Sequence, residues 1–196
     1  MAKIAVFGGT FNPFHIGHYE ILASLCNSDM FDSVLLIPDR VPPHKEYKPL
    51  VTDEDRIEMC RIVCNDFSKA QLCLIEFERE GKSYTVDTIK ELKRIYPDGE
   101  FYVACGGDMI KTLDTWYDFD VLKSLASFIA FRRGGDVGFD CDVENMKAKG
   151  ANIIVFNDRI TDISSTMLRG GIKKEYLPKK VWEYVDRRGI YKRKDN

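Results

Sequence analysis

Short apolar runs of strand length alternate with helical patterns along most of the chain. Continuous apolar runs are typical of strands buried on both faces, and such strands occur in parallel sheets covered by helices. The runs lie at 4–7, 34–37, 72–77, 101–105, 128–131 and 153–156. The helical patterns lie near 15–26, 53–65, 85–96, 109–124, 142–149 and 178–188. This alternation predicts a doubly wound, Rossmann-like α/β fold: a mostly parallel sheet of five or six strands, helices on both faces and a small C-terminal helical part.

The whole pattern fits one domain. The chain has 196 residues, of which 44% are hydrophobic, so it can bury a sizeable core. No repeat, low-complexity tract or domain linker interrupts the alternation. We therefore expect a single domain over residues 1–196.

The charge balance argues against several classes of partner. The 29 basic and 31 acidic residues leave a formal charge of −2, so no global field attracts nucleic acid or a membrane surface. No apolar run reaches the roughly 20 residues that cross a bilayer, and residues 1–3 lead into a strand rather than a secretion signal. We expect a cytoplasmic protein that binds neither nucleic acid nor membrane. A homo-oligomer is one possible state, since small α/β enzymes often form symmetric assemblies, but no sequence feature selects it.

The six cysteines form no recognisable disulfide or metal pattern. No Cys-x-x-Cys pair is present, and Cys60 and Cys64 lie on a helical pattern where small thiols commonly pack. We expect most of the cysteines to be buried, reduced thiols.

Two of the three histidines, His15 and His18, begin a predicted helix just after the first strand. Residues three apart share one face of a helix, and a helix start offers unpaired N–H groups and a positive dipole end. Gly8 and Gly9 before them, and Gly17 between them, allow a ligand close to the backbone. An ordinary strand-to-helix turn is the alternative for the glycines, but the recurring histidines favour an anion site.

Zinc is the competing use of this histidine pair. A zinc site needs a third and usually a fourth protein ligand at suitable spacing. Only His44 and scattered cysteines and carboxylates are available, so we predict no metal site built from side chains.

Two further segments have the pattern of nucleotide-binding helix starts. Ser164 and Ser165 precede a helical turn with Arg169, where hydroxyls, N–H groups and a guanidinium together suit a phosphate. Taken alone, such serines are usually helix caps. Gly106 and Asp108 lie between a strand and a helix, where the carboxylate can accept a ribose hydroxyl.

The loop over 38–51 contains several prolines together with Arg40, His44, Lys45 and Lys48. A stiff, basic loop at the carboxyl end of a strand usually borders a ligand site, whereas a solvated linker is the alternative.

Five motifs in order resemble those of a known family. Residues 8–18, Gly-Gly-Thr-Phe-Asn-Pro-Phe-His-Ile-Gly-His, resemble the opening motif of the HxGH nucleotidyltransferases, and 163–169 resembles their ISSTxxR motif. Between them, 42–45 (Pro-Pro-His-Lys), 83–88 (Ser-Tyr-Thr-Val-Asp-Thr) and 107–108 with 116–117 (Gly-Asp, Trp-Tyr) resemble motifs of bacterial nicotinate mononucleotide adenylyltransferases.

The resemblance implies a Mg²⁺-dependent transferase that joins the adenylyl group of ATP to nicotinate mononucleotide, giving nicotinate adenine dinucleotide and pyrophosphate in NAD biosynthesis. It implies catalytic roles for His15, His18, Lys45 and Arg169. It implies ATP binding by Gly8, Gly9, Thr10, Phe11, His15, His18, Gly106, Asp108, Ile163, Ser164, Ser165 and Arg169. It implies mononucleotide binding by Asn12, His44, Lys45, Thr85, Trp116, Tyr117 and Arg133. For Trp116, a place in the core is the alternative to stacking on the pyridine ring.

Catalysis of this reaction requires that the two reactants be positioned, and it does not require a general base. A phosphate monoester has its second pKa near 6, so the attacking phosphate is already largely ionised at neutral pH. The rate then depends on bringing two polyanions together and on stabilising the charge of the leaving pyrophosphate. His15 and His18 are therefore interpreted as donors to the ATP phosphates, with His18 at the α-phosphate by resemblance.

Two positions depart from the family pattern. Asn12 stands where the family often has Asp, and 132–135 reads Arg-Arg-Gly-Gly where Arg-Pro-Gly is common, which leaves open which arginine contacts substrate. The rival functions are a related adenylyl- or cytidylyltransferase for nicotinamide mononucleotide or phosphopantetheine, and a nucleotide sensor without catalysis. Thr85 and Trp116 argue against phosphopantetheine, and the intact His15, His18 and Arg169 argue against a sensor.

Overall fold

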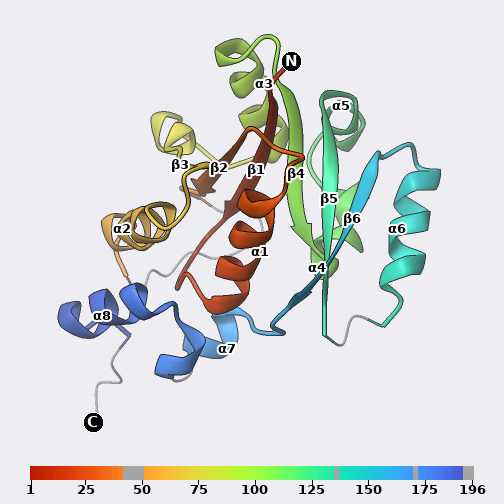
Figure 1. Ribbon diagram of the computed structural model, residues 1–196. Coiled ribbons are helices and arrows are strands. Elements are labelled where there is room, and N and C mark those ends of the chain that lie inside the picture. The colour runs from red at the N-terminus through yellow and green to blue at the C-terminus, as the bar shows by residue number, and fades with distance from the viewer. Residues whose placement is uncertain (42–50, 135–136, 170–171, 192–196) are drawn as a thin grey trace.

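A single parallel sheet organises the molecule (Figure 1). The computed structural model describes residues 1–41, 51–134, 137–169 and 172–191. In this part of the chain the sheet has six strands in the order β3-β2-β1-β4-β5-β6. The strands are β1 (Lys3–Gly9), β2 (Ser33–Pro38), β3 (Ala70–Leu72), β4 (Glu100–Gly106), β5 (Ala126–Arg133) and β6 (Ile153–Ile160).

Helices cover both faces of the sheet. They are α1 (Ile16–Asn27), α2 (Asp53–Cys64), α3 (Thr85–Ile95), α4 (Gly107–Ile110), α5 (Phe119–Leu125), α6 (Phe139–Ala148), α7 (Ser165–Arg169) and α8 (Lys179–Arg188), with 3₁₀ turns at Ile75–Glu78, Leu113–Thr115 and Lys174–Tyr176. One core joins the sheet to α1, α2, α7 and α8, and the other joins it to α3, α4, α5 and α6. Along β1, Ala5 and Phe7 belong to the first core while Ile4 and Val6 belong to the second. The predicted doubly wound, Rossmann-like α/β fold is thus confirmed, with all six strands parallel.

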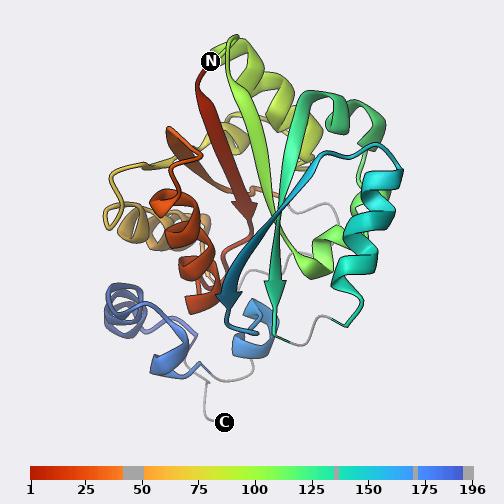
Figure 2. The ribbon, with the colours of Figure 1, turned by 45° about the vertical axis from the view of Figure 1, so that its right-hand side comes forward.

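The strand order fixes where a ligand site can form. The chain moves outward from β1 to β3 and then returns to the other side of β1 at β4, so the connections leaving β1 and β4 diverge. In open α/β sheets, ligands bind in the crevice at the carboxyl ends of the strands at such a switch point. Figure 2 shows α7 beside the carboxyl ends of β5 and β6, at the same end of the sheet.

Two predicted elements differ in the structure. The predicted strand over 72–77 is wrong beyond Leu72, because residues 75–78 form a 3₁₀ turn. The register pairs Leu36 with Leu72, so a longer strand would bring Leu74 opposite Pro38, which has no N–H to donate.

The predicted helix over 109–124 is wrong as a single element. It is divided into α4, the Leu113–Thr115 turn and α5, because Trp116 is extended and Asp118 adopts a left-handed φ of 55°. The break presents Trp116 and Tyr117 on a turn rather than on a helix.

Other local predictions are confirmed. Thr52 caps α2 through a reciprocal capping box with Asp55. The cysteines are free thiols, of which Cys26, Cys60, Cys64 and Cys105 are buried. Within the described ranges, no helix is both long enough and apolar enough to span a bilayer.

Candidate active site

A cavity of about 410 Å³ lies at the carboxyl ends of the central strands. It is lined by the ends of β1, β2, β4 and β5, by the start of α3, and by α4 and α7. Most of the predicted site residues line it: Gly8, Gly9, Thr10, Phe11, His18, Thr85, Gly106, Asp108, Trp116, Tyr117, Arg133, Ser165 and Arg169. The fold thus brings together segments that are far apart in the sequence.

The two histidines form the N-terminal cap of α1. The backbone N–H of His18 donates to Nδ1 of His15 at 3.3 Å, and the backbone N–H of His15 donates to Nδ1 of His18 at 3.2 Å. A neutral imidazole has one donor and one acceptor nitrogen, so with Nδ1 accepting, the proton lies on Nε2. Each ring in its neutral form therefore offers an Nε2–H donor.

Aromatic rings fix the orientation of His18. Its ring centroid lies 5.0 Å from Phe11, 5.3 Å from Phe14 and 6.1 Å from Phe7. The His15 ring stacks on its other side at 3.5 Å. Because these neighbours are themselves buried, the His18 ring is held in place before any ligand arrives.

His15 is more enclosed than His18 and does not line the cavity. Its side chain is 2% exposed. Burial, together with the positive charge of Arg133, lowers the pKa of His15 to about 3. His15 is therefore neutral at physiological pH, and its Nδ1 accepts the backbone N–H of His18.

Gly17 allows the start of α1 to approach the chain after β6. A Cβ atom at this position would lie 3.0 Å from the Thr161 carbonyl oxygen and 3.3 Å from Nδ1 of His15. Glu20, in the next turn, accepts hydrogen bonds from the backbone N–H and the hydroxyl of Thr161. The glycine of the motif thus has a packing role, separate from that of the histidines.

The α7 segment lines the cavity and is bonded to the loop after β1. Ser165 Oγ donates to the Pro13 carbonyl oxygen at 3.0 Å, and Arg169 Nη1 donates to the Asn12 carbonyl oxygen at 3.0 Å. The loop after β1 is therefore bonded directly to α7, the second segment that the sequence predicts to bind phosphate. Two other predicted residues do not line the cavity: Ile163 is buried in the core, and Ser164 caps α7 by accepting the N–H of Met167.

The end of β4 brings a carboxylate and a guanidinium together. Arg133 Nη1 lies 3.5 Å from Asp108 Oδ1. A Cβ atom at Gly106 would lie 2.8 Å from that oxygen and 3.1 Å from Arg133 Nη2, so a larger residue there would displace the ends of these two side chains. Arg132 pairs instead with Asp140 and lies 4.6 Å from the centroid of the Phe139 ring. Of the two arginines, Arg133 lines the cavity.

An aromatic wall borders the cavity on the side of α3. Tyr84 and Tyr117 stack with their centroids 4.4 Å apart and an angle of 30° between their planes. Trp116 lines the cavity and also packs against the second core, so a core role describes part of its environment and stacking on a pyridine ring stays a prediction. Thr85 begins α3 beside them.

The remaining predicted residues lie elsewhere. Asn12 is 5% exposed and does not line the cavity; its Oδ1 accepts the hydroxyl of Tyr191 at 2.6 Å. His44 and Lys45 lie outside the described residues. Among the described residues, no three side chains of His, Cys, Asp or Glu are grouped to hold a metal ion.

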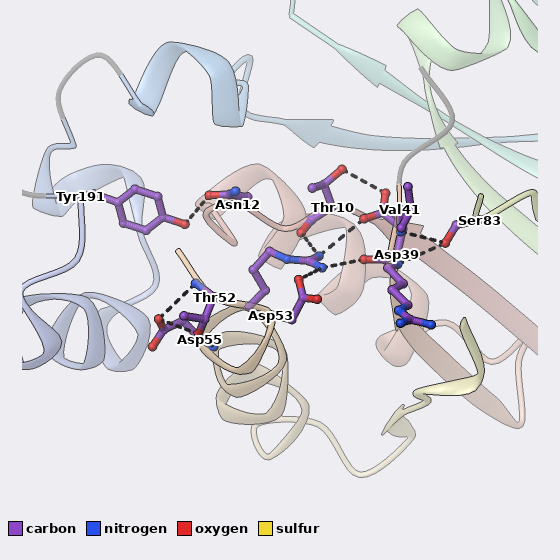
Figure 3. A network of polar contacts seen from close by, with 11 residues as sticks. Thr10, Asn12, Asp39, Val41, Thr52, Asp53, Asp55, Ser83 and Tyr191 are labelled. Carbon is purple, nitrogen blue, oxygen red and sulfur yellow. Dashed lines mark hydrogen bonds and ion pairs between the residues drawn. The ribbon is translucent and has the colours of Figure 1, made fainter. Parts of the chain in front are cut away.

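Asp39 and Arg56 are among the residues at or beside the cavity that were not predicted from the sequence. Asp39 lines the cavity and accepts the hydroxyl of Thr10 at 3.0 Å (Figure 3). Asp39 follows β2 as Asp108 follows β4, and a carboxylate just after a buried strand could have been recognised in the sequence. Arg56, in the first turns of α2, donates to the carbonyl oxygens of Thr10 and Asp39. Nothing in its sequence context distinguishes it from a surface arginine.

Comparisons with known proteins agree with this geometry. A family model described as cytidylyltransferase-like matches residues 6–171. The chain is 36% identical to a probable nicotinate-nucleotide adenylyltransferase of Halalkalibacterium halodurans, over 98% of this chain and 92% of that protein. It is 36% identical to one of Fusobacterium nucleatum, over 96% and 99%. The structure resembles Plasmodium falciparum nicotinic acid mononucleotide adenylyltransferase complexed with NaAD (TM-score 0.77, 20% identity, 97% and 98% coverage), a likeness of fold.

Proposed function

The chain belongs to the cytidylyltransferase-like family of nucleotidyltransferases, and from that premise we infer that it transfers the adenylyl group of ATP to nicotinate mononucleotide. The products are nicotinate adenine dinucleotide and pyrophosphate, and the reaction is a step of NAD biosynthesis. The observation that carries this inference is His18, which is oriented by the cap of α1 and lines the cavity together with Ser165 and Arg169. Together they suit a polyphosphate, and the named relatives match along nearly their whole length.

The chain's own residues would act by orientation and charge stabilisation. The phosphate of the mononucleotide would attack the α-phosphorus of ATP, a new P–O bond would form, and the bond to pyrophosphate would break. His18 would donate Nε2–H toward the α-phosphate, and His15 would donate from the same cap. Arg169 would stabilise the charge of the leaving pyrophosphate. No side chain needs to remove a proton, because the attacking phosphate is already ionised.

The remaining wall of the cavity would hold the mononucleotide. Trp116 would stack on the pyridine ring, and the backbone near Thr85 and Tyr117 would recognise its carboxylate. Arg133 and Lys45 would contact the phosphate, and His44 would also contact the mononucleotide. Asp108 would accept a ribose hydroxyl of ATP.

Mg²⁺ fits this site as a companion of ATP. The ion prefers oxygen ligands, keeps several waters and is usually bound through substrate phosphates and one or two carboxylates. Asp39 and Asp108 both line the cavity and offer such carboxylates. When bound, Mg²⁺ would neutralise charge on the triphosphate and on the leaving pyrophosphate.

A direct assay tests the proposal. Purified protein is given ATP and Mg²⁺ with either nicotinate mononucleotide or nicotinamide mononucleotide, and pyrophosphate release is measured. We expect release with the acid and much slower release with the amide. No release with either would refute the enzyme assignment, and a preference for the amide would overturn the choice of substrate. Addition of EDTA should stop the reaction, and excess Mg²⁺ should restore it.

A further inference from the structure

One guanidinium is completely enclosed beside the loop that follows β1. Arg56 belongs to α2, and its side chain is 0% exposed. Arginine keeps its charge in proteins, and a buried charge is costly unless it is paired and hydrogen-bonded. The partners of Arg56 therefore indicate which groups it holds in place.

Those partners come from two different strand ends. Arg56 Nη1 donates to the Thr10 carbonyl oxygen at 2.7 Å, and Nη2 donates to the Asp39 carbonyl oxygen at 2.7 Å. Nη2 also donates to Asp53 Oδ1 at 2.8 Å, and Nη1 lies 3.5 Å from Asp39 Oδ1. One planar side chain thus joins the segment after β1 to the segment after β2.

The two segments are also bonded to each other. The Thr10 hydroxyl donates to Asp39 Oδ2 at 3.0 Å, a contact visible in Figure 3. The backbone N–H of Asp39 donates to the Gly9 carbonyl oxygen at 3.0 Å. Thr10 and Asp39 line the cavity, whereas Arg56 does not.

We propose that Arg56 is a positioning residue for adenylyl transfer, which acts through Thr10 and Asp39 and touches no substrate itself. The inference rests on the proposed function. Thr10 and Phe11 belong to the loop that leads into the His15–His18 cap. A shift of this loop would displace the histidines that are proposed to donate hydrogen bonds to the phosphates. A misplacement of about 1 Å can cost about 10² in rate when the chemistry depends on alignment.

Lysine cannot replace this side chain. The guanidinium presents its donors in a rigid plane, so two nitrogens reach acceptors on opposite sides. An ammonium concentrates its donors on one atom and cannot bond the Thr10 and Asp39 carbonyl oxygens in the same way. Arg56→Lys therefore preserves the charge while removing the bridge that the guanidinium makes between the Thr10 and Asp39 carbonyl oxygens.

The chain offers two controls. Arg61 lies on the same helix, where its side chain is 51% exposed and pairs with Glu58. Arg61→Lys should therefore change neither kcat nor the melting temperature. Tyr184→Phe removes the hydrogen bond from Tyr184 to Asp55 Oδ1 (2.7 Å), which joins α8 to α2 and leaves every bond of Arg56 intact. Tyr184→Phe should lower the melting temperature and leave kcat unchanged.

The test is steady-state kinetics on the full chain at a temperature where circular dichroism shows each variant folded. We expect Arg56→Lys to lower kcat about 10²-fold while either KM changes less than about fivefold. Asp53→Asn, which replaces a charged acceptor of Arg56 outside the cavity lining by a neutral one, should lower kcat about fivefold. If Arg56→Lys does not fold, the kcat of Asp53→Asn tests the positioning role of Arg56 instead.

A kcat of Arg56→Lys within about threefold of the unsubstituted protein, with a melting temperature lowered as in Tyr184→Phe, would overturn the proposal and leave Arg56 a purely structural residue. A rise in KM alone would overturn it too, because that is the signature of lost uniform binding. An unsubstituted protein without adenylyl transfer would instead refute the proposed function, so the two failures are distinguishable.

Discussion

The imidazole rings of His15 and His18 lie face to face with their centroids 3.5 Å apart, and each ring accepts the backbone N–H of the other residue. This reciprocal arrangement is a capping box in which histidines take the places of the usual serine and glutamate. It uses Nδ1 of each ring for the backbone. In the proposed function, the side chains that cap the helix would therefore also orient the Nε2–H of His18 toward a phosphate.

Removing the imidazole of His18 should abolish most of the activity. His18→Ala is expected to lower kcat by about 10² or more, the scale for losing a donor to the transition state. His18→Asn is a sharper variant, because an Asn oxygen can accept the backbone N–H of His15 while no donor extends to the position of Nε2. Pyrophosphate release measures kcat, and circular dichroism checks the fold. If His18→Asn turned over at the normal rate, the role given to Nε2 would be wrong.

The buried imidazole of His15 should make stability depend on pH. Its pKa is about 3 in the folded protein against 6.5 for an ordinary histidine, so below pH 6.5 the unfolded chain binds a proton that the folded chain does not. The stabilisation is complete above pH 6.5 and is lost progressively as the pH falls toward 3. The slope of unfolding free energy against pH from this group is at most about 1.4 kcal/mol per unit.

His15→Asn tests this linkage. Asparagine is a preferred N-cap residue, so α1 should keep its cap while the titrating group is removed. Urea unfolding between pH 3 and 6.5 should give a flatter dependence for His15→Asn than for the unsubstituted protein. Parallel curves for the two proteins would contradict the assignment of the slope to His15.

The two adjacent arginines should differ in their effect on catalysis. Arg133 lines the cavity, whereas Arg132 lies over Phe139 and pairs with Asp140. Arg133→Ala should lower kcat/KM for the mononucleotide about 10- to 10²-fold, because a hydrogen bond to a charged group contributes roughly 1.5–3 kcal/mol. Arg132→Ala should stay within about threefold. Equal losses in both variants would show that the loop, rather than one guanidinium, carries the effect.

The Tyr191 hydroxyl should contribute to stability through Asn12. Tyr191→Phe removes the donor to the buried Asn12 Oδ1, and an unsatisfied buried acceptor costs about 1–3 kcal/mol. The free energy of unfolding from urea titration measures this cost. Tyr176→Phe is the control, since no hydroxyl hydrogen bond of Tyr176 occurs among the described residues, and it should change stability by less than about 0.5 kcal/mol.

The fold and most of the cavity lining follow from local sequence features. Gly8, Gly106 and Asp108 come directly after buried apolar runs, and the carboxyl ends of parallel strands meet at one edge of a sheet. Asp39 satisfies the same rule and could have been predicted from it. Motif resemblance supplied Thr85 and Trp116, whose positions depend on the turns that precede α3 and α5.

What could not be predicted depends on contacts distant in sequence. In the sequence, Arg56 has the pattern of an exposed arginine on an ordinary helix. It is buried only because α2 packs against the ends of β1 and β2. The break before α5 depends on a left-handed Asp118, and no glycine or proline marks it in the sequence. The early end of β3 depends on Pro38 of the neighbouring strand.

The bond between Tyr191 and Asn12 spans 179 positions of the chain. On the ribosome, the loop after β1 is therefore made long before the hydroxyl that holds Asn12. A nascent chain that has completed β1 and α1 carries both histidines but lacks the tyrosine that bonds to the loop before them. The order of synthesis thus delays the last contact of this loop until Tyr191 has left the exit tunnel.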